Sequence, residues 1–314
     1  MRAAILREYD TTPQLGEFED PADRDGAVAA EVLAAGLNPV DLRKAAGAFP
    51  LAPKPELPSV AGGEGVARMP DGSRAYFSDP VAPHGALAQR TLLQPAAVYR
   101  VPDGVDDGVA VALGIAGLAG WLALEWSGKL AEGESVLVLG ASGTVGQVAV
   151  QAAKLLGAGR VVAAARNAQK LERAKELGAD ATVELTLEGD ALTEALREAA
   201  GGGFDVIVDP LWAEPAVAAG RAANRFGRLV ALGQSAGLHA TFSSADVRNK
   251  AVSIVGHTNY AIPDADRRAA YERMCAHAVA GELTADYEEV PLEQAPEAWE
   301  RLRSGPGSKL IVRP

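Results

Sequence analysis

The chain has 314 residues, 48% of them hydrophobic, and a formal net charge of −11 at pH 7. This length allows two domains with separate cores, and the acidic balance disfavours nucleic acids and membrane surfaces as partners. The single cysteine, Cys275, excludes internal disulfides and cysteine-rich zinc lobes. Charges in the first nine residues interrupt any signal-peptide core, so we expect a cytoplasmic protein.

The first third of the chain alternates short β-like runs with Pro and Gly punctuation. This pattern predicts an irregular β domain, with strands at Ala3–Leu6, Ala27–Ala35, Gly65–Ala67, Arg74–Phe77 and Ala86–Leu93.

A stretch without charged residues follows at Val109–Leu124. It is shorter than the roughly 20 residues that cross a bilayer and contains several glycines. We therefore expect a buried helix here.

A glycine-rich turn occupies the middle of the chain. An apolar strand, Val136–Leu139, leads into glycines at spacing three, and a helix at Gln147–Leu156 and a second strand at Arg160–Ala165 follow. In a βαβ unit the first glycine permits a tight turn, the second lets a pyrophosphate approach the backbone, and the third lets helix and strand pack closely. The predicted dinucleotide-binding residues are Gly140, Ala141, Ser142, Gly143, Thr144, Val145 and Gly146.

Strands and helices alternate after this turn, which predicts an α/β fold of the Rossmann type, a doubly wound parallel sheet. The further strands are expected at Ala181–Glu184, Asp205–Asp209, Leu229–Leu232 and Val252–Val255. An amphipathic helix at Asp264–Ala280 follows, and the tail ends in a strand at Leu310–Val312 that can return to complete the first domain.

The end of the second Rossmann strand indicates which cofactor the chain prefers. An acidic residue there binds the 2′-hydroxyl of NAD, whereas an arginine suits the 2′-phosphate of NADP. Here the strand ends at Arg166, Lys170 lies one helical turn further on, and no acid occurs before Glu172. Two cations facing one phosphate predict NADPH; the alternative is that both are solvated surface charges.

Gly233, Gln234 and Ser235 begin a G-x-S-x-G pattern typical of hydrolase nucleophiles. That pattern requires a helix directly afterwards, whereas Leu238–Phe242 is typical of extended chain. We predict instead that these three residues border the cofactor.

Several strings in a fixed order resemble the medium-chain dehydrogenase/reductase superfamily, specifically its zinc-free quinone oxidoreductase branch. Besides the glycine turn they are Ala35–Asp41, Val60–Gly65, Gly117–Leu124, Lys175–Asp180, Phe204–Asp209, Gly227–Gly233 and Gly307–Val312. The resemblance implies a β-rich, GroES-like catalytic domain at 1–113 with 261–314, a dinucleotide-binding domain at 114–260, and a substrate site in the cleft between them.

The resemblance also implies roles for individual residues. Zinc relatives carry Cys where Asn38 stands and His where Gly63 stands, so we expect no metal site. Asn38 stands where relatives contact nicotinamide and substrate, and Tyr260 follows the last Rossmann strand; these are the candidate catalytic residues. Asn38 as a turn former and Tyr260 as a packing residue are the alternatives.

Departures from the family pattern leave the substrate open. Relatives often carry Tyr near Arg43 and Phe49 and Thr at Ala119, and smaller residues than Leu211 and Trp212. Trp212 either narrows the substrate pocket or packs on its neighbours.

Two classes of function follow from these patterns. The first is an NADPH-dependent, zinc-independent reductase of a small-molecule quinone or related conjugated carbonyl, with an enone or enoyl-thioester reductase as its rival. The second is a catalytically silent NADPH-binding sensor or structural protein. The resemblance further implies a homodimer formed by edge strands, with Val252–Val255 as the candidate edge.

Overall fold

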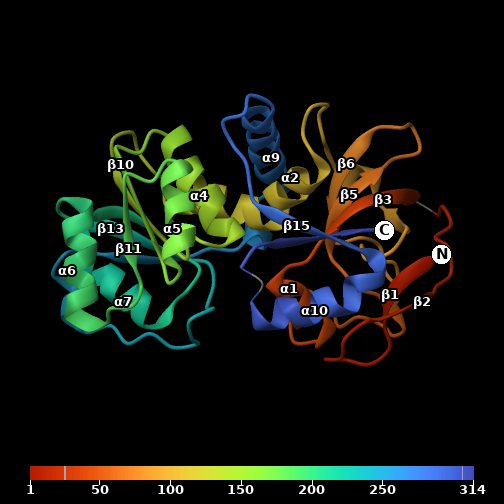
Figure 1. Cartoon of the computed structure of the whole chain (residues 1–314), viewed down its shortest axis with the longest axis horizontal. Helices are drawn as coiled ribbons and strands as arrows, with labels where there is room; N and C mark the ends of the chain where they lie inside the picture. The colour runs from red at the N-terminus through yellow and green to blue at the C-terminus, as the bar shows by residue number, and fades with distance from the viewer. Residues whose placement is uncertain (25, 306) are drawn as a thin grey trace. The chain divides into compact units, whose positions relative to one another are not determined.

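The computed structural model describes residues 1–24, 26–305 and 307–314 (Figure 1). The chain forms two compact units, one made of Met1–Ala116 with Tyr271–Pro314 and the other of Gly117–Ala270.

The first unit contains two mixed or antiparallel sheets. A three-stranded sheet has the order β2-β1-β4, and a larger sheet has the order β15-β16-β3-β5-β6-β8, with β7 paired to β3. The strands of the first unit are β1 (Arg2–Leu6), β2 (Gln14–Glu17), β3 (Val28–Gly36), β4 (Ser59–Val60), β5 (Glu64–Arg68), β6 (Arg74–Ser78), β7 (Arg90–Leu93), β8 (Tyr99–Arg100), β15 (Tyr287–Pro291) and β16 (Lys309–Arg313).

The C-terminal tail belongs to the first unit, as the sequence indicated. β16 pairs antiparallel with β3, placing Ile311 opposite Gly36. Gly36 is required at this crossing, because a Cβ there would lie 2.4 Å from Val111 Cγ1. The helices around these sheets are α1 (Pro39–Ala45), η1 (Pro95–Ala97), α2 (Asp107–Ala112), η5 (Leu292–Gln294) and α10 (Ala295–Ser304).

The second unit is a parallel sheet with the order β11-β10-β9-β12-β13-β14, which confirms the predicted doubly wound fold. Its strands are β9 (Ser135–Leu139), β10 (Arg160–Ala165), β11 (Ala181–Glu184), β12 (Phe204–Asp209), β13 (Ala223–Ala231) and β14 (Ser253–Gly256). The central strand explains why the sheet forms, since the four apolar side chains at 136–139 are fully buried, each contributing about 1.5–3 kcal/mol.

Helices cover this sheet, with α3 packed on α4 and α6 packed on α7 (Figure 1). They are α3 (Leu118–Leu122), η3 (Ala123–Ser127), α4 (Thr144–Leu155), α5 (Ala168–Glu176), α6 (Gly189–Ala200), α7 (Ala213–Ala222), α8 (Ser244–Arg248) and η4 (Asn259–Ala261). The strand order reverses between β9 and β12, so the loops after these strands lie at the switch point where ligands collect in such sheets.

The uncharged stretch at 109–124 is buried but is not one continuous helix. It consists of α2, η2 (Leu113–Gly117), α3 and η3, with a kink at Gly114, where ψ is −121°. A Cβ on Gly114 would lie 2.2 Å from the Tyr76 ring, so close packing against that ring requires the glycine. By length and composition Asp107–Ser127 could cross a membrane, but 78% of its apolar window is buried inside the protein, as is typical of a core helix.

Two further expectations need correction. The strand predicted at Ala86–Leu93 forms only from Arg90, because Ala86 N and Leu87 N donate to the loop carbonyls of Gly62 and Ala61 instead of to a strand. The strand predicted at Leu229–Leu232 begins earlier, at Ala223.

The helix predicted at Asp264–Ala280 is confirmed as α9 (Asp264–Val279). Its Cys275 is buried, and burial raises the pKa of this thiol to about 12.

Candidate functional site

The glycine turn after β9 has the backbone geometry that the sequence predicted. Gly140 lies in the left-handed region at φ +64°, where glycine is favoured. A Cβ on Gly146 would lie 2.5 Å from both Ala141 Cα and Gly140 O, so only glycine lets α4 pack this closely. A Cβ on Gly143 would meet nothing nearer than Gly140 O at 3.7 Å.

The turn opens onto the N-terminus of α4. Gly143 is the residue before the helix, and Ser142, Thr144 and Val145 are partly exposed, whereas Ala141 is buried. The first amides of a helix have no intrahelical acceptor and carry the positive end of its dipole, so they attract phosphate. Open space at Gly143 beside these amides fits a dinucleotide pyrophosphate.

The loop after β12 meets the glycine turn, and the loop after β13 meets the loop after β12. A Cβ on Gly140 would lie 3.1 Å from both Leu211 Cδ2 and Pro210 Cγ, and one on Gly233 would lie 2.4 Å from Pro210 O. Ser235 donates to the same carbonyl from its amide, at 3.3 Å, and from its hydroxyl, at 3.2 Å. The structure therefore brings Gly140, Pro210 and the Gly233–Ser235 loop together at the switch point.

Ser235 lacks the setting of a hydrolase nucleophile. The described residues 236–243 contain no helix, and the next one begins at Ser244, whereas the elbow needs a helix immediately after the serine.

Asp209 is a functional candidate that the sequence analysis did not single out. Its side chain is fully buried at the end of β12, where the Oδ1 atom accepts from Leu211 N at 2.9 Å and Trp212 N at 2.8 Å. Burial raises the pKa of this carboxyl to about 6, although the two amide hydrogen bonds lower it. The carboxyl thus holds the β12–α7 loop that contacts the glycine turn. An Asp-Pro pair directly after a buried strand was the available signal.

Trp212 packs on its neighbours, the second of its two predicted roles. Its ring lies 6.0 Å from that of Phe242, and its backbone is left-handed at φ +62°.

Arg166 and Lys170 follow β10 as predicted. Arg166 is exposed, and Lys170 is partly buried in the first turn of α5. Asn167 caps that helix by accepting from Lys170 N at 3.1 Å. The next acid, Glu172, is paired with Lys175 at 2.7 Å. Two cations therefore follow the strand end before any carboxylate.

Asn38 lies in a buried polar cluster of the first unit. Its Nδ2 donates to Glu64 Oε1 at 2.6 Å, and its Oδ1 accepts from Lys309 Nζ at 2.7 Å. Lys309 also forms an ion pair with Glu64, and the exposed fractions of the two side chains are 3% and 0%. Tyr76 OH and Ile115 N donate to Glu64 Oε2 at 2.9 and 2.8 Å.

Glu64 and Lys309 were missed as site residues, although both stand in strings that carry the family resemblance. Each is the charged first residue of a strand whose next three residues are uncharged, and that was the available signal. Asp41, another member of the cluster, accepts from Asn38 N at 2.7 Å, and burial raises its pKa to about 6.

Tyr260 lies in η4, which follows β14, and is 40% exposed. Thr258 caps η4 by accepting from Tyr260 N at 3.4 Å. Asn38 and Tyr260 belong to different units, and their catalytic roles stay predictions.

The described residues contain no group of three or more His, Cys, Asp or Glu side chains that could hold a metal ion. Two of the histidines have other partners: His257 Nδ1 lies 2.9 Å from Ser127 Oγ, and His277 Nδ1 lies 2.7 Å from Glu282 Oε2.

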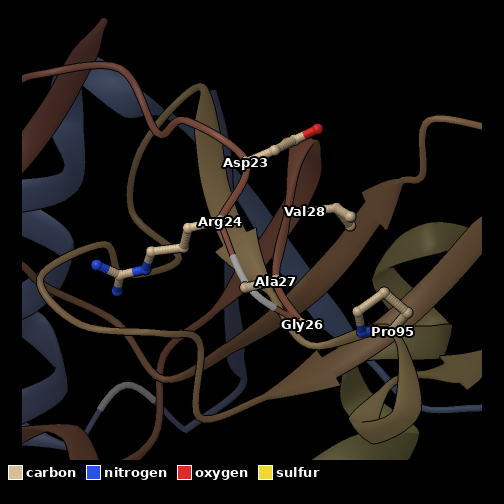
Figure 2. A pocket seen from close by; sticks show the side chains of 6 residues that line it. All are labelled: Asp23, Arg24, Gly26, Ala27, Val28 and Pro95. Carbon is tan, nitrogen blue, oxygen red and sulfur yellow. The ribbon is translucent and has the colours of Figure 1, made fainter.

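A cavity of about 460 Å³ lies elsewhere in the first unit, lined by Asp23, Arg24, Gly26, Ala27, Val28 and Pro95 (Figure 2). None of the predicted site residues lines it. The Arg24 guanidinium points away from Val28 and Pro95 in Figure 2 and donates to Ala82 O at 2.9 Å.

The parallel sheet and the glycine turn of the second unit are typical of dinucleotide-binding domains, and comparisons with known proteins identify the family. Residues 144–276 match the family of zinc-binding dehydrogenases. An alcohol dehydrogenase of Geobacillus stearothermophilus is 30% identical over 243 residues, which are 66% of this chain and 70% of that protein. The chain belongs to the medium-chain dehydrogenase/reductase superfamily.

Two further relatives have more specific names. A 2-methylene-furan-3-one reductase of Solanum lycopersicum is 32% identical over 184 residues, which are 54% of this chain and 47% of that one. The quinone oxidoreductase of Thermus thermophilus, solved also in complex with NADPH, is 25% identical with a TM-score of 0.82 over all of both chains. The chain spans about half the length of the first curated relatives that it matches.

Proposed function

We propose that the chain is an NADPH-dependent, zinc-independent reductase that transfers hydride to a small-molecule quinone or a related conjugated carbonyl. It belongs to the quinone oxidoreductase branch of its superfamily in this proposal. The observation that carries the proposal is the glycine turn of Gly140, Gly143 and Gly146, combined with Arg166 and Lys170 after the next strand.

The glycine turn is an argument for a dinucleotide cofactor, and the two cations are an argument for NADPH, which carries a 2′-phosphate that NADH lacks. Amides at the start of α4 attract the pyrophosphate, and a guanidinium contact to a 2′-phosphate is worth about 1.5–3 kcal/mol, which favours NADPH over NADH roughly 10- to 100-fold. The Thermus relative with a structure in complex with NADPH has the same fold.

Bound NADPH supplies the hydride, and the protein's own residues bind and orient the reactants. In the proposed mechanism Asn38 donates an N–H to a carbonyl oxygen without itself ionising, and Tyr260 contributes a hydroxyl from η4. The proton that completes the reduction comes from solvent. Gly233, Gln234 and Ser235 border the cofactor because their loop contacts Pro210 beside the glycine turn.

Reduction of an enone or enoyl thioester is the chief rival. The name of the tomato relative, a 2-methylene-furan-3-one reductase, favours an enone. The net charge of −11 disfavours a substrate that is attached to a large polyanionic carrier.

A homodimer joined through β14 is part of the proposal. β14 is one of the two edge strands of the parallel sheet, and its Ile254 is 41% exposed. An unpaired strand edge is a ready surface for pairing with a second copy. We place this dimer in the cytoplasm.

The decisive experiment is NADPH oxidation by a small ortho-quinone in the presence of a metal chelator, with an acceptor-free control. We expect turnover that is unchanged by the chelator and roughly 10-fold lower kcat/KM, or lower still, with NADH. Reduction of enones alone would select the rival activity. Tight NADPH binding without oxidation by either acceptor would contradict the enzyme and favour the silent NADPH-binding protein.

A further inference from the structure

The Asn38 carboxamide is held at both of its polar atoms by charged side chains. Glu64 can only accept hydrogen bonds when ionised, and the ammonium of Lys309 can only donate them. Turning the carboxamide over would set an NH₂ group against the ammonium and an oxygen against the carboxylate. The 2.6 Å contact of Nδ2 with Glu64 and the 2.7 Å contact of Oδ1 with Lys309 therefore fix one orientation.

Glu64 and Lys309 together form a clamp on Asn38, and the clamp is held in place by further contacts. Lys309 is nearly fully buried, Glu64 is fully buried, and the two form an ion pair, so Asn38, Glu64 and Lys309 close a ring of hydrogen bonds. Tyr76 OH and Ile115 N hold the other oxygen of Glu64, and β5 and β16, which carry Glu64 and Lys309, both pair with β3. Each strand thus brings one charge to Asn38 from a different part of the sequence.

The orientation decides what Asn38 offers a ligand. Nδ2 carries two hydrogens, and Glu64 takes one of them. Asn38 is only 4% exposed, and Oδ1 already faces an ammonium, so any contact of its carboxamide with a ligand would use the second Nδ2 hydrogen as a donor. A group presented in this way recognises acceptor atoms such as a carbonyl oxygen.

We propose that Glu64 and Lys309 are positioning residues that lock the Asn38 carboxamide as a hydrogen-bond donor, so that the site selects carbonyl-type acceptors. This inference rests on the proposed function, because it assigns to that reductase the group that orients its substrate or the nicotinamide carboxamide. A fixed donor needs no reorganisation when charge develops on the oxygen that it contacts, which is how preorganised donors stabilise a transition state.

A double-mutant cycle between residues 38 and 309 tests the kinetic part. We expect Asn38→Ala to lower kcat about 100-fold, as loss of a preorganised donor does, and Lys309→Met to lower it about 10-fold through misplacement of that donor. If Lys309 acts through Asn38, Lys309→Met has no further effect on kcat in the Asn38→Ala background. Multiplying effects would overturn the inference.

Two companion variants separate positioning from folding. Lys309→Met leaves Glu64 as an unpaired buried charge, so the pair Glu64→Gln with Lys309→Met is measured alongside it; this pair keeps an acceptor for Nδ2 but removes the grip on Oδ1. Lys154→Met is the matched control, because Lys154 forms its 2.6 Å ion pair with Asp180 at the surface of the second unit. We expect the control to keep wild-type kcat.

Deuterium exchange of the Asn38 side-chain amide, followed by NMR, tests the clamp without turnover. The signals are identified by their absence in Asn38→Ala. We expect exchange to be roughly 10-fold faster in the Glu64→Gln, Lys309→Met pair than in the wild type, because opening of the clamp exposes the amide, and unchanged exchange would overturn the inference. If the wild type fails to oxidise NADPH with any of the acceptors, but exchange is still faster in the variant pair, the proposed function is contradicted and the positioning of Asn38 is not.

Discussion

The glycine turn of the second unit and the Asn38 cluster of the first unit are built differently. The turn presents backbone groups, whereas the cluster presents side-chain groups. The turn consists of backbone, and its glycines are needed because any Cβ at Gly146 would meet main-chain atoms at 2.5 Å. The Asn38 cluster consists of buried side chains whose charges neutralise each other. A backbone site depends on space and a side-chain site depends on pairing, so the two should fail under different substitutions.

The largest effect is expected from unpairing the buried charge in the first unit. Lys309→Met leaves Glu64 buried without its cation, which destabilises a protein by about 3–5 kcal/mol. Denaturant unfolding measures this change. The exposed pair of Arg301 and Glu288, 2.6 Å apart, is the comparison, and Arg301→Met should cost about 0–1 kcal/mol. Equal costs at the two sites would show that burial of the pair does not matter.

Asp209 should give the stability of the second unit a pH dependence. Its pKa is about 6 in the folded protein against 3.8 for the ordinary group. Between these values the folded state binds more protons than the unfolded state at this group, so the contribution of Asp209 to stability is most favourable below about pH 4, falls as pH rises to about 6, and is constant above that. Two pH units correspond to about 3 kcal/mol.

The substitution Asp209→Asn isolates this contribution, since an amide oxygen can still accept from Leu211 N and Trp212 N but does not titrate in this range. Relative to the wild type, the variant should gain about 3 kcal/mol of unfolding free energy between pH 4 and pH 7. Chemical denaturation at both pH values measures it, and a difference that is independent of pH would contradict the expectation.

Cofactor preference tests the cations that follow β10. Arg166→Asp replaces a cation with an acid suited to a ribose hydroxyl, and we expect NADPH affinity to fall roughly 10- to 100-fold relative to NADH, or about 1.5–3 kcal/mol. Fluorescence titration with both nucleotides is the measurement. Arg225→Asp, a charge reversal after α7, serves as the control. Unchanged affinities for NADPH and NADH would remove Arg166 from the site.

The second and third glycines of the turn, Gly143 and Gly146, provide the finest comparison. Gly146→Ala forces a methyl group against Ala141 Cα and Gly140 O, and overpacking of this kind costs about 1–3 kcal/mol. Gly143→Ala should leave stability nearly unchanged, because its Cβ has open space, while still weakening nucleotide binding. Thermal unfolding with and without NADPH separates the two effects. Equal destabilisation by both substitutions would refute the separate roles of these glycines.

Sequence patterns predicted those parts of the molecule whose conformation depends on residues adjacent in the sequence. The doubly wound sheet followed from alternating apolar strands and helices, and Gly140–Gly146 followed from glycine spacing, because both are properties of short continuous segments. The kink at Gly114 could not be predicted, since it depends on the Tyr76 ring, which is 38 residues away in the sequence. The late start of β7 likewise depends on carbonyls of Gly62 and Ala61 that occupy the amides of Ala86 and Leu87.

The sequence by itself determined the parallel sheet, the glycine turn and the two cations after β10, because backbone conformation and strand ends are encoded locally. Only the tertiary structure decided that Glu64 and Lys309 grip Asn38, and that Asp209 holds the loop against Gly140. These contacts join residues from strands that meet only when the sheets form, and burial then turns ordinary charges into fixed hydrogen-bonding partners.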